Sequence, residues 1–176
     1  EFGFFAPDKV AGLKYCSLSD SLDAKEMDFT NIWKVHTFSG GVVFQAEEKL
    51  FIFRNGKIEV ISPSTSFHTS FIVNDVLYIR ERGIGLMQWD GKELTKIQGS
   101  ELFENTGIFL MVPFGKKKNE ILIGTQDSGF QIFNYSRNEN TFRPFTVSDK
   151  ALLEQAKVTG GILTTDGSIA ISTMLD

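Results

Sequence analysis

Short apolar segments alternate with tight polar turns along the whole chain. Four polar turns divide it, at residues 39–41, 74–75, 116–119 and 166–167. Each turn is followed by a strand-like apolar segment, and the equivalent positions in these segments are Val43, Leu77, Leu122 and Ala170. Their spacings of 34, 45 and 48 residues predict a repeated supersecondary unit built of β-strands.

A second hairpin follows the first in each unit. Asn55-Gly56 and Asp90-Gly91 lie between strand-like segments at matching positions. Both residues of a two-residue type I′ turn take positive φ, which Asn, Asp and Gly tolerate best, so each pair predicts such a turn. In the third unit a polar loop takes this place, between residues 130–133 and 142–145.

Each unit is therefore predicted to hold four antiparallel strands in meander order, which we name inner, second, third and outer. The inner strands are predicted at residues 33–38, 67–73, 108–114 and 159–163. The second strands are continuous apolar runs, which are typical of strands covered on both faces. In one outer strand Ile58 and Val60 alternate with Glu59, so a single face of that strand is expected in the core.

The predicted fold class is all-β, with β-propeller blades that are four-stranded antiparallel meanders: about three complete blades and two half blades, forming part of a larger propeller. Residues 1–176 are expected to be one partial propeller domain. Its predicted parts are the half blade 1–20, the blades 29–62, 66–98 and 107–147, and the half blade 158–176. The first half resembles a third and an outer strand, and the last resembles an inner and a second strand. The halves therefore either pair with one another or belong to a larger ring, and their open edges favour self-association.

Two connections between units have helical composition. Residues 149–157 combine good helix formers with an acidic start and a basic end, and residues 19–27 predict a further short helix. Both connect an outer strand to the next inner strand, as do residues 100–106. In propellers these connections share one face with the second-to-third loops, so we expect binding on that face.

The composition agrees with this fold, because 17 of 176 residues are Phe and 16 are Gly, residues suited to strands and turns. The net charge is −4 and the longest basic run is residues 116–118, so nucleic-acid binding through phosphate contacts is not expected. No apolar run is long enough to insert this segment into a membrane. The single cysteine, Cys16, excludes an internal disulfide, and we expect it to be a small buried side chain.

Residues 121–125 (Ile-Leu-Ile-Gly-Thr), with Gly129-Phe130 shortly after, resemble the repeat of the two-component regulator propeller family. Residues 169–173 keep the Thr but have Ser in place of Gly. The first two units depart from the pattern, with Gln45-Ala46 and Ile79-Arg80 at the equivalent places.

Residues 76–89 are also similar to the propeller region of bacterial sensor proteins of this kind. The resemblance implies a periplasmic, extracytoplasmic sensor segment of a hybrid histidine kinase or a related regulator. Known members of the family sense oligosaccharides, so the resemblance implies a carbohydrate or similar small ligand. The remaining propeller blades and downstream sensor domains are the implied protein partners.

Catalysis is not expected. The histidines are His36 and His68, the thiol is Cys16, and no nucleophile elbow, zinc-protease motif or acidic calcium loop occurs. The two histidines lie on different predicted inner strands, and we interpret them as structural or channel-lining. The spacing supplies no further ligands, so no metal and no cofactor are predicted.

The binding candidates are polar or aromatic residues on the face that carries the long loops. Arg80, Glu81 and Arg82 lie where a second strand leaves for the third, and the matching positions in other units are Glu47, Glu48, Gln126 and Asp127. A carbohydrate needs planar hydrogen-bonding groups and an aromatic platform. Trp33 or Phe67 can supply the platform, and His68 can approach the channel on the same face. The competing interpretation is that the charges are solvated loop tips and the aromatic residues are core.

These observations favour a non-enzymatic module that captures a ligand on the loop face and shifts the population of a signalling arrangement. One alternative is a propeller-fold polysaccharide lyase or glycosidase, which needs an acid/base pair at the channel mouth. The other is a protein–protein scaffold, which uses the same face without a small-molecule pocket.

Overall fold

The computed structural model describes residues 1–9, 12–115, 119–127, 129–135, 140–148 and 156–175. Almost all regular structure in these residues is antiparallel β-sheet. The chain divides into two compact units, Glu1–Phe67 and His68–Asp176. We call them unit 1 and unit 2, and each is larger than the four-stranded repeat described in the sequence analysis. Each unit is described by itself below.

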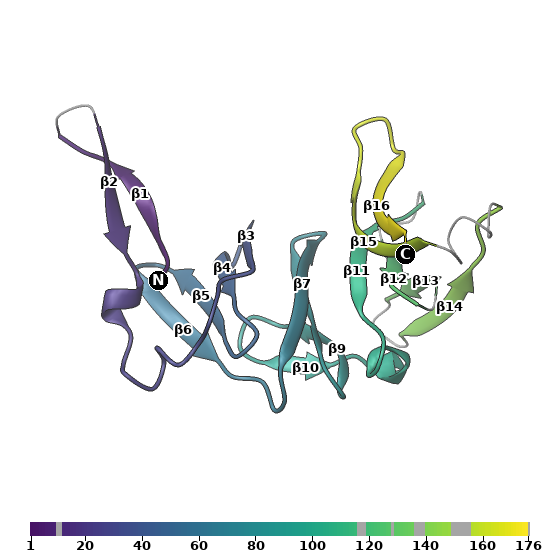
Figure 1. The fold of residues 1–176 in the computed structure, drawn as a ribbon, viewed down its shortest axis with the longest axis horizontal. Coiled ribbons are helices and arrows are strands. Elements are labelled where there is room, and N and C mark those ends of the chain that lie inside the picture. The colour runs from purple at the N-terminus through teal and green to yellow at the C-terminus, as the bar shows by residue number, and fades with distance from the viewer. Residues whose placement is uncertain (10–11, 116–118, 128, 136–139, 149–155, 176) are drawn as a thin grey trace. The chain divides into compact units, whose positions relative to one another are not determined.

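Unit 1 contains one two-stranded and one four-stranded sheet (Figure 1). The two-stranded sheet pairs β1 with β2, and the four-stranded sheet has the meander order β3-β4-β5-β6. The elements are β1 (Gly3–Pro7), β2 (Leu13–Ser17), η1 (Ser19–Ser21), β3 (Lys34–Phe38), β4 (Gly41–Gln45), β5 (Leu50–Arg54) and β6 (Lys57–Ile61).

Aromatic side chains join the two sheets of unit 1. The Phe2 ring lies 4.7 Å from the rings of both Phe44 and Phe51, measured between centroids. Leu18 completes the buried cluster, and Ile58 and Val60 pack against its margin. Glu59, which alternates with them, forms an ion pair with Arg54.

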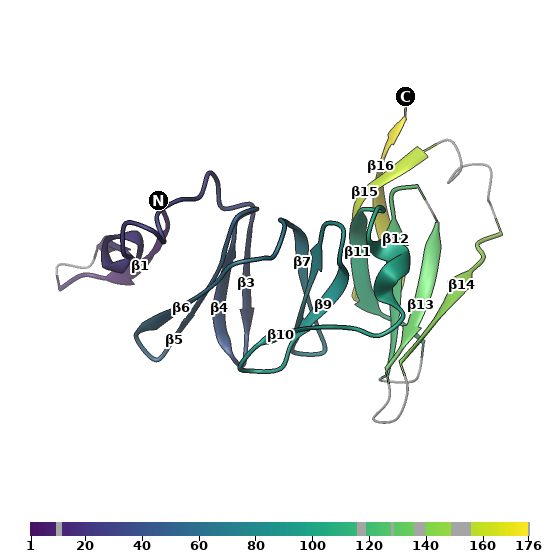
Figure 2. The ribbon, with the colours of Figure 1, turned by 90° about the horizontal axis from the view of Figure 1, so that it is seen from below.

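Unit 2 contains two four-stranded meanders and a terminal hairpin (Figure 2). The sheet β7–β10 begins at the last residue of unit 1, and it is followed by the sheet β11–β14 and the pair β15–β16. The elements are β7 (Phe67–Val73), β8 (Val76–Glu81), β9 (Gly85–Trp89), β10 (Leu94–Lys96), η2 (Ser100–Phe103), β11 (Ile108–Pro113), β12 (Glu120–Thr125), β13 (Phe130–Asn134), β14 (Thr141–Phe145), β15 (Ala156–Leu163) and β16 (Ile169–Leu175).

Two hydrophobic layers hold unit 2 together. One lies between the sheets β7–β10 and β11–β14, where Tyr78 packs edge-on against Phe133. The other lies between β11–β14 and the hairpin β15–β16, where Val158 and Ile169 contact the cluster around Leu110. The second strands β8 and β12 are buried along nearly their whole length, so the prediction that second strands are covered on both faces is confirmed for these two. It is wrong for β16, which is exposed from Ala170 to Met174.

Two of the predicted tight turns have the expected backbone. Asn55 and Gly56 have φ of 51° and 74°, and Asn74 and Asp75 have φ of 51° and 65°. The hairpin predicted at Asp90-Gly91 is present, since Trp89 pairs with Leu94 as its strands predict, but the two-residue turn is wrong because the loop has four residues, 90–93. The Asp90 carboxylate accepts hydrogen bonds from the amides of Lys92 and Glu93, and this local cap stabilises the longer loop.

The helix predicted at residues 19–27 is wrong beyond its first turn, because only Ser19–Ser21 is helical and has 3-10 geometry. Ser19 is buried, and its hydroxyl accepts a hydrogen bond from the Phe2 amide and donates one to the Phe2 carbonyl. These side-chain bonds to the backbone compete with a continuing helix.

The helix predicted at residues 149–157 falls mostly outside the described residues. Its last two residues are strand, since Ala156 pairs with Leu175 and Lys157 pairs with Met174 in the β15–β16 hairpin. Their backbone groups are used by the sheet, so the helical prediction is wrong for this pair.

Candidate functional site

The polar candidates of unit 2 gather around the connection from β10 to β11. Arg80 and Glu81 end β8, Arg82 follows them, and His68 lies at the start of β7. We call the residues His68, Arg80, Glu81, Arg82, Glu104, Phe109, Gln126 and Asp127 the unit 2 loop cluster.

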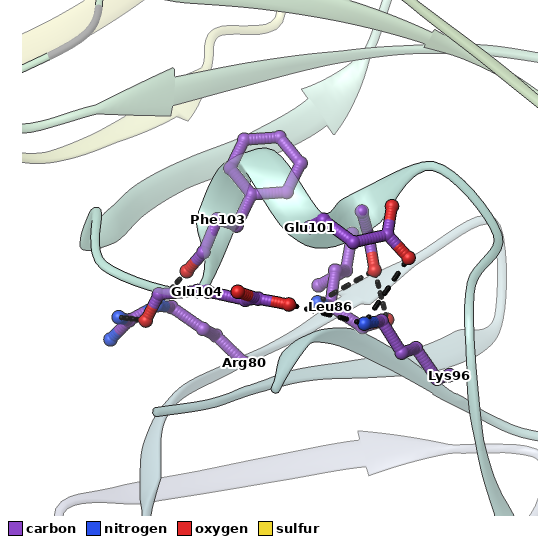
Figure 3. Close-up of polar contacts among 7 residues, drawn as sticks. Arg80, Leu86, Lys96, Glu101, Phe103 and Glu104 are labelled. Atoms are coloured by element: carbon purple, nitrogen blue, oxygen red, sulfur yellow. Dashed lines mark hydrogen bonds and ion pairs between the residues drawn. The ribbon is translucent and has the colours of Figure 1, made fainter. Parts of the chain in front are cut away.

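Arg80 is the anchor of this cluster, because it is only 4% exposed. Its Nε donates to the carbonyl of Phe103 at 2.7 Å, and its Nη2 donates to the carbonyl of Glu104 at 2.6 Å (Figure 3). Burial and the nearby Arg82 lower the pKa of Arg80, although a guanidinium stays charged in proteins. The guanidinium therefore fixes the end of η2. Because it is buried and donates to two carbonyls of the chain, it is not the solvated ligand contact that the sequence predicts.

The segment held by Arg80 is also fixed by Lys96. Its ammonium lies 3.2 Å from Oε1 of Glu101, inside η2, and 3.3 Å from Oε1 of Glu104, directly after η2 (Figure 3). The hydrogen bond to Glu101 is the largest cause that raises the pKa of Lys96. Sequence reasoning treats residues 100–106 as a plain loop and misses these groups, although the Ser-Glu-Leu-Phe-Glu pattern places two carboxylates three residues apart.

Ser100 attaches the same segment to the sheet. Its buried hydroxyl accepts a hydrogen bond from the Leu86 amide at 3.1 Å and donates to the Leu86 carbonyl at 3.2 Å. Gly85 must be glycine here, since a Cβ at its φ of 122° would lie 2.7 Å from the Ser100 carbonyl oxygen. The connection is thus held to β8, β9 and β10 at once.

Backbone hydrogen bonds bring the turns of neighbouring sheets to this connection. The Gly83 amide donates to the Glu104 carbonyl at 2.9 Å, and the Gln126 amide donates to the Gly107 carbonyl at 3.1 Å. The β8–β9 turn and the β12–β13 turn are therefore both hydrogen-bonded to the segment between β10 and β11, residues 97–107, which we call the strap. Of the predicted residues that these turns carry, Arg82 and Asp127 are exposed and Gln126 is half-buried.

His68 lies below this surface. Its ring contacts Phe109 edge-on with centroids 5.1 Å apart, and its Nδ1 lies 3.1 Å from the Thr69 hydroxyl. Burial, followed by the charges of Arg80 and Arg82, lowers the pKa of His68 to about 4. The imidazole is therefore neutral at physiological pH, and it packs as a polar aromatic side chain.

The predicted binding residues that lie in unit 1 are Trp33, Glu47, Glu48 and Phe67. Trp33, which precedes β3, is 51% exposed, and its amide donates to the Gln45 carbonyl. Glu48 accepts hydrogen bonds from the amide and the hydroxyl of Thr30, and the Glu47 carbonyl accepts one from the Phe67 amide. Phe67 is fully buried, so the expectation that it can offer an aromatic platform is wrong.

Two further expectations concern unit 1. Cys16 is partly exposed on β2, so the buried position expected for its thiol is wrong. His36 is half-buried on β3.

A shallow pocket of about 430 Å³ lies at the β5–β6 turn, lined by Arg54, Asn55, Lys57, Ile58 and Glu59. Sequence reasoning does not select this pocket, although the charges on both sides of Asn55-Gly56 mark it.

In the described part of the chain, no group of three or more His, Cys, Asp or Glu side chains is arranged to hold a metal ion. No helix in that part has the length and apolar character needed to cross a membrane.

The comparisons with known proteins give a structural likeness. No protein-family model matches the sequence, and no curated protein sequence matches it significantly. The resemblance to two-component regulator propellers therefore stays a prediction.

Among solved structures, the chain is similar to the crystal structure of the N-terminal domain of Nup159, with a TM-score of 0.52 and 15% identity over 76% of this chain. It is also similar to a chain in the S. cerevisiae complex of Dbp5 with Nup159, Gle1, IP6 and ADP, with a TM-score of 0.50 and 13% identity over 77% of this chain. The matched region spans 37% of each solved chain. These neighbours are β-propellers, so the all-β blade fold predicted from the repeat is confirmed.

Proposed function

We propose that this chain is a non-enzymatic protein-interaction module, which binds a protein partner through the unit 2 loop cluster. The observation that carries the proposal is the strap from β10 to β11, which is fixed by Arg80, Lys96 and Ser100 and receives the turns of two neighbouring sheets. A surface built from several turns on rigid strands is the usual form of a propeller binding face.

The similarity to solved propellers supports this proposal over small-molecule sensing. One of the similar structures is a complex in which Dbp5 is bound to Nup159. At 13% identity this likeness concerns the fold alone. A protein–protein scaffold needs a rigid face with exposed charged groups. On the unit 2 loop cluster, Arg82 and Asp127 are the exposed charged groups.

The proposal of a non-enzymatic role is supported by the state of His68. A general base must reach its substrate and titrate near the working pH. His68 packs against Phe109, and its pKa is lowered to about 4. These properties suit a structural group.

Affinity capture from cells of the source organism tests the proposal. The bait is the full chain, compared with Arg82→Glu combined with Asp127→Lys on the cluster, and with Lys92→Glu on the exposed β9–β10 turn as the matched control. We expect one protein to be captured by the parent and by Lys92→Glu, and at least about tenfold less by the cluster variant, as for loss of a charged contact in a binding face. That protein, once purified, must bind the parent chain saturably. Equal capture by all three baits would reject the loop cluster as the binding face.

Trp33 favours a second candidate function, capture of a carbohydrate in an extracytoplasmic sensor. An indole that is half exposed beside a strand start is a suitable stacking surface for a sugar ring. A glycan array with the parent and Trp33→Ala tests it. Binding of one sugar class that is lost in Trp33→Ala and kept in Arg82→Glu supports this second function, and absence of glycan binding by the parent rejects it.

A further inference from the structure

The unit 2 loop cluster contains a buried positive charge that is held by neutral groups. Arg80 is only 4% exposed, and its guanidinium donates to the main-chain carbonyls of Phe103 and Glu104. Among the described residues, no Asp or Glu side chain forms an ion pair with it. Buried charges in proteins are usually paired with an opposite charge, because removing an ion from water is costly. The position of Arg80 is thus fixed, while its charge has no counter-ion in the described part of the chain.

One nitrogen of this guanidinium faces the surface. The hydrogen bonds of Arg80 use Nε and Nη2, and Nη1 has no hydrogen bond to a described residue. No fully buried side-chain nitrogen of the described residues lacks a hydrogen-bond partner. Nη1 therefore lies in the small part of Arg80 that reaches the surface, and an anion can approach the guanidinium from that side.

The nearest acidic side chains are turned away from Arg80. Figure 3 shows the Glu104 carboxylate pointing toward Lys96, whose ammonium lies 3.3 Å from it, while the Glu104 carbonyl binds Arg80. Glu81 follows Arg80 on β8, and successive side chains of a strand point to opposite faces. Tyr78, two residues before Arg80, packs on the sheet β11–β14. Arg80 shares that face with Tyr78, so Glu81 points to the other face of the sheet.

Arg82 adds a second positive charge at the surface beside Arg80. It is exposed in the β8–β9 turn, and the next residue, Gly83, donates its amide to the same Glu104 carbonyl that Arg80 binds. Burial, followed by the charge of Arg82, lowers the pKa of Arg80, and burial, followed by both arginine charges, lowers that of His68. The two guanidinium charges therefore act at one place, which we call the Arg80–Arg82 site.

This site differs in sign from the chain as a whole, whose net charge is −4. Asp127, on the β12–β13 turn, is the exposed acidic residue of the cluster. The turn is held to the strap by the bond from the Gln126 amide to the Gly107 carbonyl. An acidic group bound at the Arg80–Arg82 site is therefore attracted by the two arginines and repelled by Asp127.

We propose that the Arg80–Arg82 site binds an acidic segment of a protein partner, with an Asp or Glu carboxylate on Arg82 and the fixed charge of Arg80 beneath it. Guanidinium groups are well suited to carboxylates, because their N–H donors form charge-assisted hydrogen bonds with both oxygens. The inference rests on the proposed function and names the chemistry of its partner.

The first test is a titration of the full chain with a fluorescein-labelled oligoglutamate peptide, followed by fluorescence anisotropy. We expect saturable binding that weakens as salt is added. Arg82→Gln should weaken it about fivefold or more, and Asp127→Asn should strengthen it about two- to threefold, the usual effect of one exposed charge. Lys92→Gln on the exposed β9–β10 turn changes the net charge as Arg82→Gln does, and it should leave the affinity unchanged. Thermal melts check that the variants are folded.

Three results of this titration would overturn the proposal. They are the absence of saturable oligoglutamate binding, equal weakening by Arg82→Gln and Lys92→Gln, and displacement of the peptide by an equal concentration of inorganic phosphate. The last result would show a site for a free anion in place of a protein side chain.

Nuclear magnetic resonance places the bound peptide without altering Arg80, whose replacement disturbs the fold. In a chain with 15N-labelled arginine, the side-chain Nε–H signals of Arg80 and Arg82 should both shift when oligoglutamate is added. The signal of Arg54 on β5 of unit 1 is the matched control and should stay in place. A shift of Arg54 in the absence of shifts at Arg80 and Arg82 would assign the binding to another surface and reject the Arg80–Arg82 site.

Affinity capture with the full chain as bait separates this inference from the proposed function. A partner captured less by Arg82→Gln and more by Asp127→Asn supports the acidic contact. The reverse order keeps protein binding at the loop cluster and rejects an acidic partner. Equal capture by the parent and both variants rejects the proposed function, whereas the oligoglutamate titration still decides whether the Arg80–Arg82 site binds carboxylates.

Discussion

The Arg80 guanidinium and the Phe103 carbonyl form a buried hydrogen bond of 2.7 Å that joins strand β8 to the strap between β10 and β11. The same side chain also reaches the carbonyl of Glu104. A helical turn leaves carbonyl groups without partners at its end, and Arg80 satisfies two of them at the end of η2. The position of the strap, and with it the unit 2 loop cluster, depends on this residue.

Replacement of Arg80 by Met should therefore destabilise the fold strongly. The change keeps much of the apolar stem but removes the donors to two carbonyls. The Glu104 carbonyl keeps the Gly83 amide as a donor, whereas the Phe103 carbonyl loses its bond to Arg80, and a buried acceptor left without a partner costs about 1 to 3 kcal/mol. We expect a loss of about 2 kcal/mol in the free energy of unfolding, measured by urea titration. Arg82→Met, at the exposed neighbour, should change it by less than about 0.5 kcal/mol. Similar losses for the two variants would contradict the anchoring role.

Glycines at positive φ should differ in their tolerance to Ala. Gly56 has φ of 74° and open space where a Cβ would lie, so Gly56→Ala should cost about 1 kcal/mol, from backbone strain alone. Gly85 has φ of 122°, and its Cβ would lie 2.7 Å from the Ser100 carbonyl oxygen, so Gly85→Ala should cost about 3 kcal/mol or more. Urea midpoints of the two variants measure the difference. Equal midpoints would show that the strap moves away from β9 at little cost.

The sequence predicts the strands and several turns because their signals are local. Asn55-Gly56 forms the expected turn, since both residues accept positive φ without help from distant groups. Asp90-Gly91 carries the same signal, but the Asp90 carboxylate caps two later amides and lengthens the loop. A side chain that can satisfy nearby amides has more than one turn available, and the dipeptide does not distinguish them.

The site is harder to predict because its key residue breaks a general rule. Charged side chains are usually exposed, so Arg80 is expected among the loop-tip candidates together with Arg82. The structure buries Arg80 and exposes Arg82. The burial of Arg80 depends on carbonyls more than twenty residues further along the chain. The residues around Arg80 in the sequence therefore cannot predict that its side chain is buried.

The threonine in the Gly-Thr motif has a structural role that a substitution can measure. The buried Thr125 hydroxyl donates to the Gly129 carbonyl at 2.7 Å and closes the turn from β12 to β13. Thr125→Val keeps the shape and removes the donor, so we expect a loss of about 1 to 2 kcal/mol in unfolding free energy. Thr95, whose exposed hydroxyl lies 3.4 Å from the Gln88 carbonyl, is the matched control. Thr95→Val should leave the urea midpoint nearly unchanged, and an equal loss there would argue against a special role for Thr125.

Stability should fall as the pH is lowered from 7.5 to 5, in part because of His68. Its pKa is lowered to about 4 in the folded chain by burial and by the charges of Arg80 and Arg82, against an ordinary value of 6.5. Between these two values the unfolded chain binds a proton that the folded chain does not, so protonation favours unfolding. The stabilisation from the neutral imidazole is therefore fully present above the unfolded pKa and is lost as the pH falls toward the folded pKa.

The size of this loss distinguishes His68 from other titrating groups. For these pKa values, we expect the parent chain to lose about 2 kcal/mol in unfolding free energy from this residue between pH 7.5 and pH 5. His68→Gln keeps a polar side chain that does not titrate, so its loss over the same range should be smaller by that amount. Urea unfolding of both chains at pH 7.5, 6 and 5 gives the two slopes. If the slope of His68→Gln equals that of the parent, the imidazole takes up its proton over the same pH range in the folded and the unfolded chain, and a pKa lowered by burial beneath the loop cluster is ruled out.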